Sequence, residues 1–116
     1  MVAAPKKIQA RFYTTASGRK PVREWLLELQ ADDRRIVGYD IQTVEFGWPV
    51  GMPTCRSIGD GLWEVRSNLT AGTIGRVLFC IIDGDMILLH AFIKKTQKTP
   101  RDDIDAALRR RKEAIG

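Results

Sequence analysis

The sequence predicts a single α+β domain over residues 1–116, with a small antiparallel or mixed β-sheet, an N-terminal helical hairpin packed on one face and a C-terminal helix. Three features indicate this class: two amphipathic helical stripes, a series of short strand-like segments between glycine turns, and a capped helical pattern at the end. The length of 116 residues and the hydrophobic content of 44% allow a self-supporting core. With 28% charged residues, the composition excludes disordered, collagen-like and coiled-coil proteins.

The first half predicts one strand and two helices. Residues 7–14 alternate loosely and are rich in strand-forming residues, which indicates a first strand. Pro21 suits the first turn of a helix, whose apolar positions recur at helical spacing: Val22, Trp25, Leu26 and Leu29. A second stripe begins near Asp32, is ended by Gly47 and Pro49, and carries Val37, Ile41, Val44 and Trp48.

The second half predicts four strands and a closing helix. Turn residues, including the strong hairpin signal Asp83-Gly84, separate the strands that we expect at 54–58, 62–68, 73–82 and 86–95. Thr99 suits the N-cap of the last helix and Pro100 its first position. The order is therefore β-α-α-β-β-β-β-α. With the helices packed on one side of the sheet, we expect the other face to be free and polar.

A net charge of +5 favours a polyanionic partner. The basic residues are spread along the chain, so an anion-binding surface has to be assembled by folding. Cys55, Cys80 and a single histidine form neither a disulfide scaffold nor a metal-ligand spacing, so we expect reduced thiols, no metal and no cofactor. The longest apolar runs, at 77–82 and 86–89, are far shorter than the roughly 20 residues that span a bilayer. We therefore expect a cytoplasmic protein without a membrane partner.

Two arginines are predicted to lie in mid-strand on the polar face. Alternation in LWEVRSN places Glu64 and Arg66 opposite the core residues Trp63 and Val65. Arg76 similarly lies opposite the core face of its strand. A guanidinium keeps its charge and presents a planar fork that suits phosphate oxygens. The alternative is a cross-strand ion pair of either arginine with Glu64, and the spacing alone does not decide between the two.

The register of the last hairpin decides which side chains join Arg76. With a two-residue loop, Ala91 lies opposite Arg76 and Lys95 shares its face, while His90 and Phe92 face the core. With a three-residue loop, Phe92 lies opposite Arg76, and the residues that share its face are His90 and Lys94. We favour the first register because it buries Phe92 and Leu88.

The basic residues of the last strand and the loop after it have two interpretations. Lys94, Lys95 and Lys98 form either a solvated edge or, beside the two arginines, part of an anion site. His90, the only histidine, is more commonly a partly buried residue with satisfied hydrogen bonds than a catalytic one.

Residues 61–110, GLWEVRSN…GRVLFCIIDGDMILLHAFIKKTQKTPRDDIDAALRR, resemble the HigB branch of the RelE-type toxins, including its phage-derived members. Typical members share an LWELR strand, a YRVLY-like strand, an LLHGFxKKTxKTP segment and an EIxxAxxR helix. The chain departs from this pattern at Val65, at Gly75, where an aromatic residue often stands, and at Ala91.

The resemblance implies a RelE-like fold and a ribosome-dependent mRNA endonuclease, the toxin of a type II toxin–antitoxin pair. Its partners would be mRNA on the ribosome and a cognate helix-turn-helix antitoxin. Such an enzyme would need no metal, because the 2′-OH attacks the adjacent phosphate and leaves a 2′,3′-cyclic phosphate. The alternative is a non-catalytic RNA-binding or antitoxin-binding accessory module.

The resemblance also assigns candidate residues by their positions in the shared motifs. The catalytic candidates it implies are Arg66, Arg76, Lys94, Lys95 and, at the position of a late histidine, His90. The candidates for RNA binding are Arg56, Lys94 and Lys98. Arginine is a poor base, so the general base remains open among Lys94, Lys95, His90 and Glu64.

Overall fold

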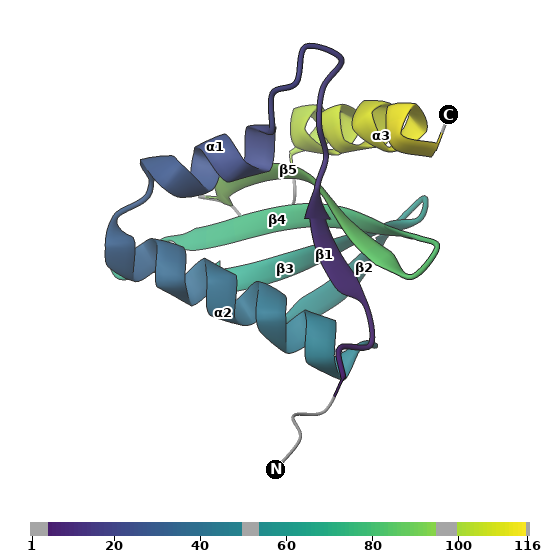
Figure 1. Cartoon of the computed structure of the whole chain (residues 1–116). Coiled ribbons are helices and arrows are strands. Elements are labelled where there is room, and N and C mark those ends of the chain that lie inside the picture. The colour runs from purple at the N-terminus through teal and green to yellow at the C-terminus, as the bar shows by residue number, and fades with distance from the viewer. Residues whose placement is uncertain (1–4, 50–53, 95–99, 116) are drawn as a thin grey trace.

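The computed structural model describes residues 5–49, 54–94 and 100–115, which form a five-stranded mixed sheet and three helices (Figure 1). The predicted order β-α-α-β-β-β-β-α is confirmed. In chain order, the elements are β1 (Gln9–Phe12), α1 (Pro21–Glu28), α2 (Ala31–Gly47), β2 (Cys55–Gly59), β3 (Leu62–Asn68), β4 (Ile74–Ile82), β5 (Asp85–Lys94) and α3 (Arg101–Ile115). Among these residues, no helix combines the length and the apolar character that crossing a membrane requires.

The helices α1 and α2 cover one face of the sheet, as the two stripes predict. Pro21 begins α1, and Asp32 and Asp33 place negative charge in the first turn of α2, where the helix dipole favours it. The first core lies between these helices and the sheet. It includes Val22, Val37, Ile41, Val44, Val65, Val77, Phe79 and Leu88. Trp25 and Trp48, the tryptophans of the two predicted helical stripes, pack against it.

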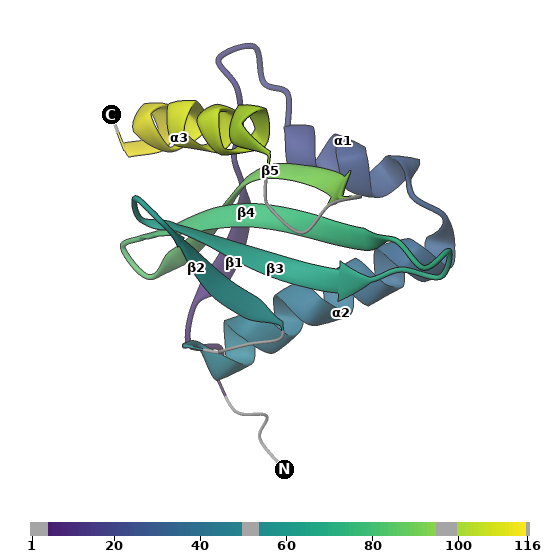
Figure 2. The same ribbon diagram turned by 180° about the vertical axis from the view of Figure 1, so that it is seen from behind.

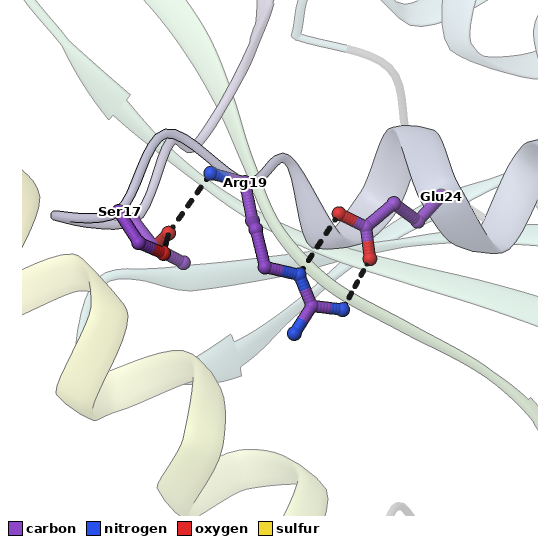
Figure 3. Close-up of polar contacts among 4 residues, drawn as sticks. Ser17, Arg19 and Glu24 are labelled. Atoms are coloured by element: carbon purple, nitrogen blue, oxygen red, sulfur yellow. Dashed lines mark hydrogen bonds and ion pairs between the residues drawn. The ribbon is translucent and has the colours of Figure 1, made fainter.

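The loop between β1 and α1 is held by its own polar contacts (Figure 3). The Arg19 backbone N–H donates to Thr15 Oγ1 over 3.0 Å, and Thr15 Oγ1 lies 3.0 Å from Ser17 Oγ. The Arg19 guanidinium pairs with Glu24 over 2.5 Å, in the first turn of α1. Because the Arg19 side chain is 71% exposed, this is a surface ion pair of small energetic value.

The strands lie in the order β1-β5-β4-β3-β2, with β1 parallel to β5 and every other pair antiparallel. Ile82 pairs with Asp85, so Asp83 and Gly84 form a two-residue hairpin loop. Both have positive φ, 51° and 80°, which is the backbone of a type I′ turn. The predicted Asp-Gly hairpin is therefore confirmed.

A β-bulge at Leu89 shifts the register of this hairpin beyond the turn. Near the turn Phe79 pairs with Leu88, but past the bulge Leu78 pairs with His90, and Arg76 pairs with Phe92. The prediction that Ala91 lies opposite Arg76, with His90 and Phe92 facing the first core, is therefore wrong. The bulge reverses the alternation along β5: Met86 and Leu88 belong to the first core, whereas beyond Leu89 it is Ala91 that packs against the first core and Phe92 that packs against a second one.

The second core lies between α3 and the other face of the sheet. It contains Tyr13, Leu62, Leu78, Cys80, Leu89 and Ala107. The expectation that every helix packs on one side is therefore wrong for α3, which packs on β4 and β5 and leaves part of β2 and β3 without a helix over it (Figure 2). Cys55 and Cys80 are free, as predicted, and burial raises the pKa of the Cys55 thiol to about 11.

Candidate functional site

Four basic side chains gather on the face of the sheet that α1 and α2 do not cover. Arg56 pairs with Glu64 across β2 and β3, and Arg66 pairs directly with Arg76 across β3 and β4. Lys94 pairs with Ile74, two residues from Arg76, and so shares its face. We call Arg56, Arg66, Arg76, Lys94 and the carboxylate Glu64 the cationic cluster. With four basic side chains and one carboxylate, the cationic cluster has a net charge of +3 when all five groups are ionised.

Glu64 lies at the centre of the cationic cluster. Its side chain is fully buried, and its Oε1 accepts from Arg76 Nη1 over 2.5 Å and from Arg56 Nε over 3.0 Å. Arg76 is itself 2% exposed, whereas the Arg56 side chain is 33% exposed. Of the two ion pairs that the sequence allowed for Glu64, the Arg76 pair therefore forms. Glu64 fixes the positions of two guanidiniums rather than facing solvent as a free base.

Arg66 and Arg76 stand opposite each other and retain unused donors. Like charges directly opposite in an antiparallel pair are destabilising. In addition, Nε of Arg66 and Nε of Arg76 are buried, with no hydrogen-bond partner among the described residues. Buried donors without partners cost free energy, so this arrangement is unfavourable unless a bound anion completes it.

Lys94 is a member of the cationic cluster whose pKa lies close to neutral pH. It is 5% exposed, and burial lowers the pKa of its ammonium to about 8, with the charge of Arg76 acting in the same direction. A lysine with this pKa is about one-tenth neutral at pH 7. The amine can therefore accept a proton at physiological pH, which an ordinary lysine does poorly.

His90 lies on the same face but is held by α3. Its Nε2 is 2.6 Å from Asp103 Oδ1, and its Nδ1 is 3.1 Å from Arg110 Nη1. A guanidinium only donates, so Nδ1 accepts and Nε2–H donates to Asp103. Phe92 stands between His90 and Lys94 along β5, with its ring centroid 5.7 Å from that of His90. The structure thus shows the partly buried, hydrogen-bonded histidine that the sequence had left as the commoner alternative.

Two predicted site residues, Lys95 and Lys98, lie outside the residues that the structure describes. Of the predicted residues that it does describe, the structure brings together Arg56, Arg66, Arg76 and Lys94. It places His90 farther along β5, against α3.

A small hollow of about 150 Å³ adjoins Arg66 at the edge of the sheet. Its lining residues are Asp40, Thr54, Arg66 and Asn68. Burial raises the pKa of the Asp40 carboxyl, and the Ser67 hydroxyl partly offsets this. Asp40 was not predicted as a site residue, because it lies on α2 beside the apolar stripe and the helical pattern gives no signal of a neighbouring strand end.

Together, the fold and the cationic cluster define a small α+β protein with an anion-attracting surface on one sheet face. Residues 24–112 match the family model described as Phage derived protein Gp49-like (DUF891). Since this match spans most of the 116 residues, the chain belongs to that family. No curated protein matches the sequence.

Proposed function

We propose that this protein is the toxin of a type II toxin–antitoxin pair and cleaves mRNA on the ribosome, as the HigB-like toxins that its sequence resembles do. The observation that carries the proposal is the opposed pair Arg66 and Arg76, with unused buried donors, beside Lys94. Membership of the phage-derived family is consistent with such a role. The proposed partners are mRNA and a helix-turn-helix antitoxin.

The proposed reaction needs charge stabilisation and proton transfer. The 2′-oxygen of the ribose bonds to phosphorus, the bond from phosphorus to the 5′-oxygen breaks, and the products are a 2′,3′-cyclic phosphate and a 5′-OH. Arg66 and Arg76 stabilise the dianionic phosphorane where its charge develops. The neutral amine of Lys94 accepts the 2′-OH proton, and solvent protonates the leaving 5′-oxygen. Glu64 is a positioning residue for Arg76 and Arg56.

The test is to map RNA 5′ ends after the wild-type chain is expressed alone. We expect growth arrest, with new mRNA ends that can be ligated only after enzymatic phosphorylation, because the reaction leaves a 5′-OH. New ends that carry a 5′-phosphate, or no new ends at all, would contradict the proposal.

The pKa of Lys94 gives a pH prediction. If its neutral amine is the base, single-turnover cleavage on programmed ribosomes rises about tenfold from pH 7 to pH 9, with a midpoint near the Lys94 pKa of about 8. Lys94→Arg stays protonated throughout this range, so its profile should be flat and low. A wild-type rate that falls as the pH rises would instead mean that Lys94 acts as a cation.

A second candidate function is RNA binding without cleavage. The observation that favours it is that Glu64 already neutralises part of the cationic cluster, through its 2.5 Å contact with Arg76. In that case, salt-sensitive RNA binding would persist while translating extracts contained no cleaved mRNA.

A further inference from the structure

The hollow beside Arg66 differs chemically from the cationic cluster that it adjoins. The cluster presents positive charge, whereas the hollow adds an acceptor, the Asp40 carboxylate, and the neutral polar residues Thr54 and Asn68. These residues come from α2, from the position before β2 and from the end of β3. The hollow is therefore built by three segments that only the folded chain brings together.

Arg66 and Asp40 line this hollow without neutralising each other. No ion pair joins them in the described part of the chain, although they carry opposite charges. Arg66 Nε is buried and has no hydrogen-bond partner among the same residues. A ligand that accepts from the guanidinium and donates to the carboxylate would satisfy both groups.

The size of the hollow suits one planar ring. A cavity of about 150 Å³ holds a molecule the size of benzene, and the hollow beside Arg66 has the same volume and is partly open to solvent, so it can enclose one ring of a base while the second ring of a purine lies in the opening. Its position next to Arg66 places such a ring beside any phosphate that the cationic cluster holds. A nucleobase attached to that phosphate is the ligand that meets both conditions.

We propose that this hollow is a nucleobase subsite that takes guanine. An ionised carboxylate only accepts hydrogen bonds, and guanine is the base whose Watson–Crick edge presents two adjacent donors, N1–H and the 2-amino group. Guanine also offers O6 and N7, the acceptors that arginine contacts most often. Adenine, cytosine and uracil each place at least one acceptor where Asp40 needs a donor.

The inference deepens the proposed function and rests on it, since the subsite would select which base lies beside the cleaved linkage. It can nevertheless be measured without cleavage. The probes are the 3′- and 5′-monophosphates of the four nucleosides, titrated into the whole protein and followed by amide NMR shifts. A good bidentate contact discriminates between bases by about 5- to 150-fold, so we expect a guanosine monophosphate to bind at least about fivefold more tightly than the others.

The test variant is Asp40→Asn, which keeps the shape of the side chain and replaces one acceptor with a donor. We expect it to remove the guanine preference while leaving phosphate-dependent binding of all four nucleotides. The matched control is Asp32→Asn on the same helix, where Asp32 is exposed, pairs with Arg35 and does not line the hollow. This control should retain the guanine preference.

The outcomes separate this inference from the proposed function. Equal binding of the four bases, or a preference that survives in Asp40→Asn, overturns the subsite even if the protein cleaves mRNA. A guanine preference that Asp40→Asn abolishes supports the subsite even if no cleaved mRNA is found, in which case the cleavage proposal fails alone. If both hold, the mapped cleavage sites of the wild type should have guanine beside the cut, and those of Asp40→Asn should not.

Discussion

Replacing Arg66 with alanine is expected to abolish growth arrest and to lower single-turnover mRNA cleavage by about 100- to 1,000-fold. This is the loss that follows when one preorganised donor to a developing oxyanion is removed. The fold should remain intact, because in the described part of the chain Arg66 makes no ion pair and its Nε has no hydrogen-bond partner. Removing its charge also relieves the repulsion with Arg76 opposite.

The matched control for this variant is Arg19→Ala. Arg19 is a 71% exposed arginine on the loop before α1, and its pair with Glu24 lies on the surface, where solvent screening leaves little net stabilisation. Both variants should give circular dichroism spectra and melting curves close to those of the wild type. Full toxicity of Arg66→Ala at wild-type protein levels would remove the cationic cluster from the mechanism.

Arg76→Ala is a poorer test of the same idea. Arg76 is 2% exposed and contacts the fully buried Glu64, so its removal takes away a close ion-pair partner of a buried carboxylate. Loss of activity in that variant would be mixed with loss of stability, because an under-compensated buried charge is costly. Arg66→Ala therefore tests the role in cleavage without a loss of stability, whereas Arg76→Ala changes activity and stability together.

Local patterns predict most of this fold because they follow from short-range physics. The stripe Val37, Ile41 and Val44 predicts α2, and the Asp83-Gly84 turn predicts the hairpin, since in both cases the determinants lie a few residues apart. Alternation alone likewise places Arg66 and Arg76 on the face away from Val65 and Val77. The structure adds that the two arginines are direct cross-strand partners.

The features that the sequence does not predict depend on contacts between distant segments. The bulge at Leu89 turns Phe92 toward a second core, and only the position of α3 reveals that this core exists. The same bulge places Phe92 rather than Ala91 opposite Arg76, and Lys94 on the face of Arg76 in place of the expected Lys95. Asp40 and Arg66 are 26 positions apart in the sequence but line the same hollow at the edge of the sheet. No periodicity in the sequence predicts that they lie close together.

Replacing Glu64 with glutamine is expected to lower the free energy of unfolding by about 3–5 kcal/mol. Glutamine has the same shape and keeps an acceptor oxygen, so the change isolates the loss of charge. Arg76, 2% exposed, would lose the negative charge that its 2.5 Å contact with Glu64 provides. Since domains of this kind are stable by about 5–15 kcal/mol, equilibrium urea unfolding should detect the change easily.

A control variant and a rescue variant test whether the loss of the Glu64 charge causes this destabilisation. Glu24→Gln breaks the exposed pair with Arg19, which solvent screens, so the free energy of unfolding should stay close to that of the wild type. Adding Arg76→Met to Glu64→Gln should recover most of the lost stability, because replacing a buried ion pair by an apolar side chain of similar volume is often neutral. A double variant that is no more stable than Glu64→Gln would mean that shape, not charge, fixes the cluster.

The same substitution also changes the titration of Lys94 in a known direction. The Glu64 charge raises the pKa of Lys94, opposing burial and the arginines, which together bring that pKa down to about 8. Without the carboxylate charge, the pKa should fall below 8, so any residual cleavage by Glu64→Gln should reach its plateau at lower pH than the wild type. An unshifted profile would show that the titrating base is a group beyond the reach of the Glu64 charge, and Lys94 would lose that role.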